Sequence, residues 1–143
     1  MKSTTSVKPQ TIQRVKVLID AKGKALGRVS VRVAELLMGK RKPYYVDYLD
    51  CGDYVTVINA KEVVLSGNKE TEKKYYRHSG YPGGLKTETV AKARERDARF
   101  LVEKTVKGML PKTKLGRAMY TKLDVKSDSV HNLEDGKYLV VEI

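Results

Sequence analysis

The sequence is poor in the residues that build disulfide-bonded or metal-held folds. Of its 143 residues, one is cysteine and two are histidine, and tryptophan is absent. The single thiol, Cys51, cannot form an internal disulfide, and these three side chains fall short of a four-ligand zinc site. We therefore expect a reducing compartment, no bound metal and no cofactor.

Long apolar runs are missing as well. No stretch approaches the roughly 18 apolar residues that a membrane-spanning helix needs, and the first fifteen residues lack the apolar centre of a signal peptide. The sequence therefore predicts no membrane partner and a cytoplasmic location.

Acidic residues are scarce relative to basic ones. There are 17 Asp and Glu against 29 Lys and Arg, which gives a formal net charge of +12. Two windows, residues 22–32 and 104–122, contain cations and no acid. Because like charges at neighbouring helix positions repel one another, we interpret these windows as a surface that binds a polyanion.

The chain has the length of one domain, since a domain averages about 150 residues. We expect an α/β domain over residues 15–126, preceded by a basic N-terminal arm (1–14) and followed by a C-terminal tail (127–143). Hydrophobic residues make up 41% of the chain, which is enough for a single core.

The first half of the domain has the pattern of a strand, a helix and a second strand. Residues 15–19 are β-branched and short, and apolar residues then recur at helical spacing over residues 26–37 until Gly39. Residues 54–58 lack the alternation of a half-exposed strand, which indicates burial on both faces. This order predicts a right-handed βαβ unit with parallel strands.

The second half has shorter signals. Residues 63–65 and 74–77 are candidate extended segments, and a helical pattern follows from Thr87 to Pro111, which the charged stretch 92–97 could divide in two. A short helix near residues 115–119 and an extended segment at 138–141 complete the chain.

The region from Lys107 to Arg117 predicts a helix-turn-helix corner. We expect Met109 and Leu115 to anchor it in the core, while Lys112, Lys114 and Arg117 project outward.

Tyrosines and glycines near cations suggest that the polyanion is RNA. Tyr75, Tyr76 and Tyr81 could stack on unpaired bases or donate their hydroxyls to phosphates, or could pack in the core with the hydroxyl in water. Gly83 and Gly84 either let an RNA backbone approach closely or form a turn that needs a positive φ.

The sequence supports an enzymatic function less well than it supports RNA binding. The stretch GKALGR (23–28) matches neither the phosphate loop nor the dinucleotide fingerprint. Cys51 could pair with His78 or His131 as nucleophile and base, but nothing in the sequence brings them together. The aspartates of residues 47–53 could hold magnesium, although aspartates before a strand more often form turns. We expect no catalytic residue and no small-molecule substrate.

Several strings resemble one family in order and spacing over residues 15–126. They are GKALGR (23–28), DCGDYV (50–55), YYRHSGYPGGLK (75–86), KGMLPK (107–112) and LGRAM (115–119). The chain resembles the bacterial type of large-subunit ribosomal protein thirteen.

The resemblance implies a three-layer α/β/α domain with a four-stranded, mainly parallel sheet. It also implies a structural constituent of the large ribosomal subunit that binds 23S-type ribosomal RNA, contacts neighbouring large-subunit proteins and supports assembly. The alternative is a non-ribosomal RNA- or phosphate-binding α/β module, which would not co-sediment with large subunits.

The residues expected to contact RNA combine the basic windows, the aromatic residues beside cations and the glycine loop. They are Lys22, Lys24, Arg28, Lys40, Arg41, Lys42, Lys69, Lys74, Tyr75, Tyr76, Arg77, His78, Tyr81, Gly83, Gly84, Lys86, Lys107, Lys112, Lys114 and Arg117.

Overall fold

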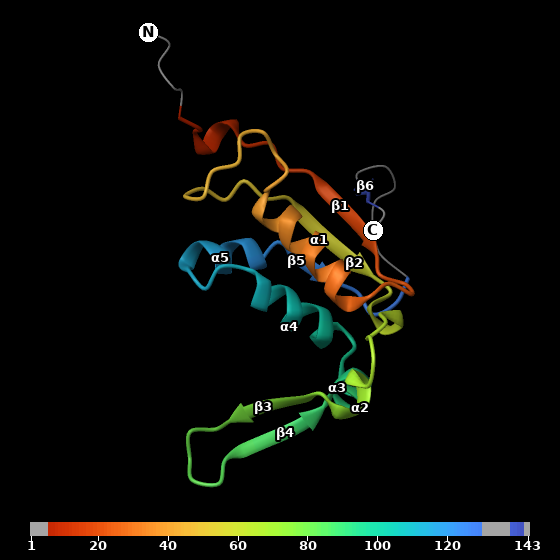
Figure 1. Ribbon diagram of the computed structural model, residues 1–143. Helices are drawn as coiled ribbons and strands as arrows, with labels where there is room; N and C mark the ends of the chain where they lie inside the picture. Colours follow the sequence, from red (N-terminus) through yellow and green to blue (C-terminus); the bar gives the residue numbers. More distant parts are fainter. Residues whose placement is uncertain (1–5, 130–137, 142–143) are drawn as a thin grey trace.

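A parallel sheet organises the computed structural model, which describes residues 6–129 and 138–141 (Figure 1). Its strands lie in the order β5-β2-β1-β6, and every neighbouring pair is parallel. The strands are β1 (Lys16–Asp20), β2 (Tyr54–Ile58), β5 (Leu123–Val125) and β6 (Tyr138–Val140). The α/β class, the four-stranded parallel sheet and the two strands expected in the first half are confirmed.

Five α-helices and two 3-10 turns connect the strands of the described residues. They are α1 (Leu26–Met38), α2 (Lys69–Glu72), α3 (Val90–Arg96), α4 (Arg99–Met109) and α5 (Lys114–Tyr120), with η1 (Pro9–Thr11) and η2 (Ala60–Glu62). Helix α1 joins β1 to β2, as expected for a βαβ unit. It ends at Gly39, whose φ of 76° is the left-handed conformation that glycine adopts readily at a helix C-terminus.

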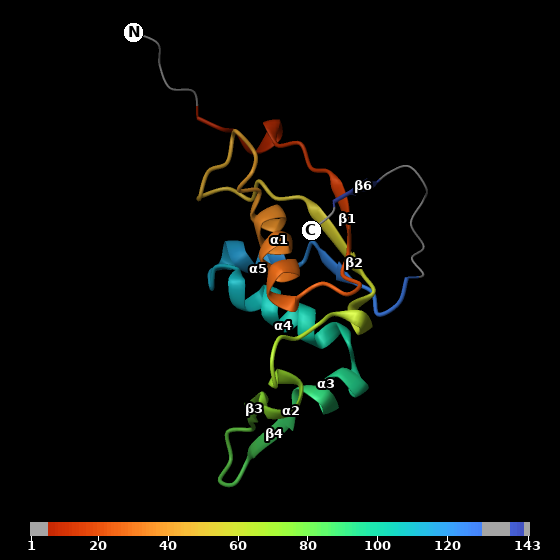
Figure 2. The same cartoon turned by 45° about the vertical axis from the view of Figure 1, so that its right-hand side comes forward.

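The core lies between the sheet and two helices. Alternate strand residues point to one face of a sheet, and Val17, Ile19, Val55 and Val57 on that face are buried. Helices α1 and α4 cover this face and pack on each other (Figures 1 and 2). The described residues thus show one helical side of the expected three-layer arrangement.

The C-terminal tail takes part in the sheet, because β6 pairs with β1. The boundaries at residues 14 and 126 stay a prediction, and residues 1–5, 130–137 and 142–143 of the arm and tail lie outside the described residues.

A two-stranded hairpin projects from the body, with α2 and α3 at its base (Figure 1). Strand β3 (Lys74–His78) confirms the extended segment expected at 74–77, and it pairs antiparallel with β4 (Leu85–Thr89). The expected helix start at Thr87 is wrong: the helix begins at Val90. Gly80 and Gly83, with φ of 89° and 70°, turn the chain back so that residues 85–89 pair with β3 instead.

The helical region divides at Asp97, between α3 and α4, as the charged stretch suggested. Helix α4 then ends at Met109, and the next residue, Leu110, has the extended backbone that is favoured before a proline. The expected anchor Met109 is wrong: its side chain is exposed, while Leu110 is buried and Leu115 packs against the core. The chain leaves the helix after Met109, and the extended backbone at Leu110 directs that side chain, rather than Met109, into the core.

Helix α5 lies close against the end of α4. A Cβ on Gly116 would overlap the Pro111 carbonyl, so this position requires glycine. The hydroxyl of Thr113 caps α5 by accepting a hydrogen bond from the Gly116 N–H at 3.3 Å.

An ion-pair network fixes the loop of residues 40–53. The buried Lys122 ammonium donates to Asp50 and to the Leu37 carbonyl, at 2.5 and 3.3 Å. The Lys42 ammonium donates to Asp53 and to the carbonyl of Gln13, at 2.5 and 2.7 Å. These contacts join the N-terminal arm, the loop and the chain before β5.

None of the helices in residues 6–129 and 138–141 combines the length and apolar character that crossing a membrane would require.

Candidate nucleic-acid interface

The hairpin turns one of its faces toward α3 and α4. Cross-strand partners share a face, and Tyr75 and Glu88 are such partners. The Tyr75 ring meets Phe100 of α4 edge-on, with 5.4 Å between centroids, and both Glu88 oxygens accept from Arg96 of α3 at 2.8 Å. These contacts hold the hairpin beside α4.

The next cross-strand pair on this face consists of two cations, Arg77 and Lys86. Like charges directly opposite each other destabilise a hairpin, and here Lys104 of α4 adds a third cation. The three side chains line a hollow of about 480 Å³ between the hairpin and α4. Its one acid, Glu88, is neutralised by Arg96, so the hollow favours an anion.

The exposed face of α4 continues this positive surface. Phe100, Lys104 and Lys107 are spaced four and three residues apart and therefore lie on one side of the helix. Lys107 reaches the Tyr120 ring of α5, with its ammonium 5.5 Å from the ring centroid.

A second hollow, of about 400 Å³, lies where α4 meets α5. Lys107, Lys112, Arg117 and Tyr120 line it, and it contains no acid. Burial raises the pKa of the Tyr120 hydroxyl above its ordinary value, with the nearby Glu103 carboxylate adding to the effect. At neutral pH this hydroxyl therefore keeps its proton and can donate a hydrogen bond.

Helix α4 contributes a cation to each hollow, and we call the basic side chains of the two hollows the α4 track. Its members are Arg77, Lys86, Lys104, Lys107, Lys112 and Arg117. None of the six forms an ion pair with any residue of the ranges 6–129 and 138–141. The structure thus brings together basic residues from two separate parts of the sequence, residues 77–86 and 104–117.

The opposite face and the tip of the hairpin are aromatic and open. Tyr76 and Tyr81 are 67% and 75% exposed, so their rings are free of the core. The ring of His78 accepts the Gly80 N–H through Nδ1 at 2.9 Å, which leaves Nε2 as the donor. Lys74 is exposed on the same face. Such side chains can stack on bases or contact phosphates.

The glycines of the tip have conformational reasons of their own. Gly83 has a φ of 70°, and a Cβ on Gly84 would overlap the Ser79 hydroxyl. The turn therefore explains both glycines, while a close approach of RNA stays a prediction.

The remaining expected contacts lie elsewhere. Arg28, Arg41 and Lys69 line a groove beside α1. The other four are near loop or helix ends: Lys22, whose ammonium is 3.5 Å from Glu62, the half-buried Lys24, and the exposed Lys40 and Lys114.

Two expected contacts are part-buried against partners inside the chain. Lys42 is held by Asp53 in the loop network, and Tyr75 packs its ring on Phe100. Burial raises the pKa of Tyr75. We therefore leave both out of the proposed interface.

Sequence reasoning missed Lys104 and Tyr120 as site residues. Lys104 was visible in the acid-free window, and its spacing of three residues from Lys107 was the signal that could have selected it. Tyr120 has no such signal, because its proximity to Lys107 depends on the angle between α4 and α5.

Among the described residues, the structure does not bring together the side chains of the Cys–His pair or of the aspartate magnesium site that the sequence suggested. Cys51 is buried before β2, whereas His78 lies on the projecting hairpin and His131 lies outside the described residues. Asp50 and Asp53 face lysines. Within the part of the chain that the structure describes, no group of three His, Cys, Asp or Glu side chains could hold a metal ion.

Comparison with known proteins decides the family. The family model described as Ribosomal protein L13 matches residues 14–132. The chain belongs to the ribosomal protein L13 family. The expected resemblance is thereby confirmed, and the match covers the sheet strands β1, β2 and β5 and both hollows of the α4 track.

Individual relatives are similar over nearly their whole length. The large ribosomal subunit protein uL13 of a Nitratiruptor species is 53% identical over 131 residues, which cover 92% of this chain and 94% of the relative. The protein of the same name from Shewanella amazonensis is 47% identical over 129 residues, covering 90% and 91%. That from Mycoplasmopsis pulmonis is 47% identical over 143 residues, covering 100% and 99%.

Proposed function

We propose that this protein is a structural constituent of the large ribosomal subunit in the bacterial cytoplasm, and that it binds large-subunit ribosomal RNA through the α4 track. It supports subunit assembly by holding RNA against the rigid α/β body and performs no catalysis. Its partners are 23S-type ribosomal RNA and neighbouring large-subunit proteins.

One observation carries the RNA-binding proposal: six cations line the two hollows of the α4 track, and none of them forms an ion pair within residues 6–129 and 138–141. An unpaired cation cluster costs folding free energy through mutual repulsion, and RNA phosphates offset that cost. Each neutralised phosphate releases counterions, so RNA affinity must fall steeply as salt rises.

The hairpin and the corner contribute different chemistry to this surface. The guanidinium groups of Arg77 and Arg117 can fork two phosphate oxygens, whereas Lys86, Lys104, Lys107 and Lys112 act as point charges. Exposed Tyr76 lies at the edge of the first hollow and exposed Tyr81 lies at the hairpin tip, and unpaired bases could stack on both rings.

The test compares two triple variants that lose the same charge. Lys107→Ala/Lys112→Ala/Arg117→Ala removes half of the track. The control Lys61→Ala/Arg99→Ala/Lys126→Ala removes three cations that are paired with Asp128, Asp97 and Asp124. Binding to in vitro transcribed large-subunit RNA is measured from low to moderate salt, with circular dichroism to verify folding.

The track variant should reduce the slope of log affinity against log salt by about three units, since each phosphate contact contributes about one. The control should bind nearly as wild type. Equal slopes for the two variants would contradict the proposal. Gradient sedimentation of cell lysate gives a second readout: wild type should migrate with large subunits and the track variant less so.

A further inference from the structure

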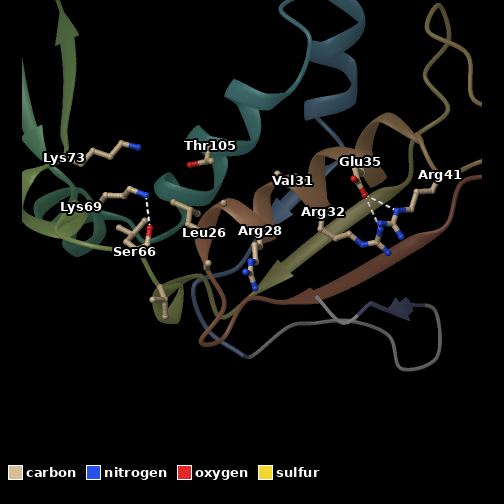
Figure 3. Close-up of a pocket in the computed structure, with 14 residues that line it drawn as sticks. Leu26, Arg28, Val31, Arg32, Glu35, Arg41, Ser66, Lys69, Lys73 and Thr105 are labelled. Carbon is tan, nitrogen blue, oxygen red and sulfur yellow. Dashed lines mark hydrogen bonds and ion pairs between the residues drawn. The ribbon is translucent and has the colours of Figure 1, made fainter.

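A groove beside α1 is separate from the two hollows of the α4 track. It has a volume of about 690 Å³ and lies between α1, the chain of residues 64–73 and Thr105 of α4. Figure 3 shows Lys69 and Lys73 reaching toward it from the side of the hairpin, while Arg28 and Arg32 extend from α1.

The rim of the groove is strongly positive. Five cations line it against one acid: Arg28, Arg32, Arg41, Lys69 and Lys73 against Glu35. The Glu35 carboxylate accepts from Arg32 and Arg41 at 3.3 and 3.0 Å. Its charge is thus already shared by two arginines, and the groove retains an excess of four positive charges.

Within the described ranges 6–129 and 138–141, the other three cations form no ion pair. Lys69 donates to the Ser66 hydroxyl, at 2.9 Å, and Lys73 lies over the Tyr75 ring, 5.3 Å from its centroid. Arg28 forms no ion pair with any residue in 6–129 or 138–141. These three groups are available to a ligand.

The floor of the groove is aliphatic. Leu26, Val31, Val64 and Leu65 line it, and Val31 and Val64 are 48% and 49% exposed. About half of each valine surface stays in contact with water, and covering it would be favourable. The two valines offer an apolar contact to whatever the rim attracts.

We propose that this groove binds an unpaired segment of RNA, with phosphates on the cationic rim and ribose and base edges against the aliphatic floor. The inference rests on the proposed RNA-binding function and adds a second contact site to it. The volume lies in the range of sites that bury a small-molecule ligand, so the groove takes one or two nucleotides rather than a duplex. In a duplex the bases are stacked inside and cannot reach such a floor.

The composition of the rim favours RNA over an acidic peptide. Cations occur at both ends of the groove, from Lys73 to Arg41, which suits the regular charges of a nucleic-acid strand. One of the three cations available to a ligand is Arg28, whose guanidinium can fork a phosphate or stack on a base.

The experiment separates rim from floor. Arg28→Ala/Lys69→Ala/Lys73→Ala removes rim charge without touching the Glu35 pairs, and Val31→Ala/Val64→Ala removes apolar contact without changing charge. Large-subunit RNA is titrated with each variant, and chemical footprinting of the RNA then identifies the unpaired nucleotides that the variant protects. The charge-matched control is Lys61→Ala/Arg99→Ala/Lys126→Ala.

We expect the rim variant to reduce the salt slope by about two units, since a single strand contributes roughly 0.7 per contact. The floor variant should bind several-fold more weakly with an unchanged slope. Both should lose the same protected unpaired nucleotides, which remain protected in the track variant.

Wild-type binding and footprints in both groove variants would overturn the inference while leaving the proposed function intact. Groove variants that bind RNA normally but fail to enter large subunits would overturn it in favour of a protein neighbour. A wild-type protein without salt-dependent RNA binding would overturn both proposals.

Discussion

The loop of residues 40–53 and the α4 track both gather basic side chains, yet the two regions differ in what surrounds these groups. In the loop network, Lys42 and Lys122 each meet a carboxylate at 2.5 Å and a backbone carbonyl. In the track, Lys104 and Lys112 are exposed and have no ion-pair partner in the described ranges.

The difference distinguishes cations that stabilise the fold from cations that are available to bind a ligand. A buried ammonium is tolerated only with a paired charge and hydrogen bonds, because desolvation is costly. In an exposed cluster without acids, the cations remain hydrated and repel one another until a polyanion binds. Sequence alone does not separate the two, since Lys122 and Lys112 belong to the same acid-free window.

The largest expected effect breaks the network. Lys122→Ala removes the closest partner of Asp50 and leaves the Gly52 N–H at 3.2 Å and Arg14 at 3.5 Å, so it should lower the free energy of unfolding by about 3 kcal/mol. Urea denaturation measures this change. RNA affinity of the folded fraction should be unchanged, because Lys122 is outside the track.

The expected loss of stability in Lys122→Ala comes from breaking the ion pair with Asp50 rather than from removing the lysine itself. Burial lowers the pKa of Lys122 despite the attraction of Asp50. The charged form is therefore penalised in the fold, and this penalty disappears as pH rises through the folded pKa toward 10.5. A change below about 1 kcal/mol would show that Asp50 finds other partners.

A smaller effect sharpens the role of the track. Arg117→Lys keeps the charge but removes the bidentate guanidinium group. The slope of log affinity against log salt should therefore remain unchanged. RNA affinity should fall about tenfold, which corresponds to one charge-assisted hydrogen bond of about 1.5 kcal/mol. The matched variant Lys112→Arg should bind at least as tightly as wild type. Filter binding at fixed salt measures both, and equal affinities for wild type and Arg117→Lys would mean that only net charge matters there.

The smallest effect concerns a paired surface carboxylate at the start of α4. Hydrogen bonds from the Arg99 side chain hold the pKa of Asp97 below 3.8. Because the folded pKa is lowered, the stabilisation is complete above pH 3.8 and is lost as pH falls through the folded pKa.

Asp97→Asn should therefore destabilise the protein by less than about 1 kcal/mol near neutral pH, as expected for an exposed pair. The difference from wild type should shrink in thermal melts recorded progressively below pH 3.8. A difference that persists unchanged in acid would assign the effect to side-chain geometry instead of charge.

Much of the fold followed from local pattern. The strand at 54–58, the end of α1 at Gly39 and the division near Asp97 were predictable because each depends on nearby residues: β-branched runs, a left-handed glycine and a charged break. Strand β4 was not, because Leu85–Thr89 is extended through its pairing with β3. Its own sequence, Leu-Lys-Thr-Glu-Thr, has no strong preference that excludes a helix.

The candidate site divides in the same way. Basic composition and acid-free windows identified Arg77, Lys107 and Arg117 as RNA contacts, which stay predictions. Lys42 sits in a basic run of its own, but its ammonium is held by Asp53, eleven residues further along the chain.

The sequence by itself determined the βαβ unit, the excess of positive charge and the resemblance to one ribosomal protein family. Each of these depends on residues that are close together in the sequence, or on composition and motif order. The tertiary structure decided which cations are internal and which form the track or line the groove beside α1. Ion pairing depends on distances between side chains that are far apart in the chain. Those distances exist only after the hairpin, α4 and α5 have packed together.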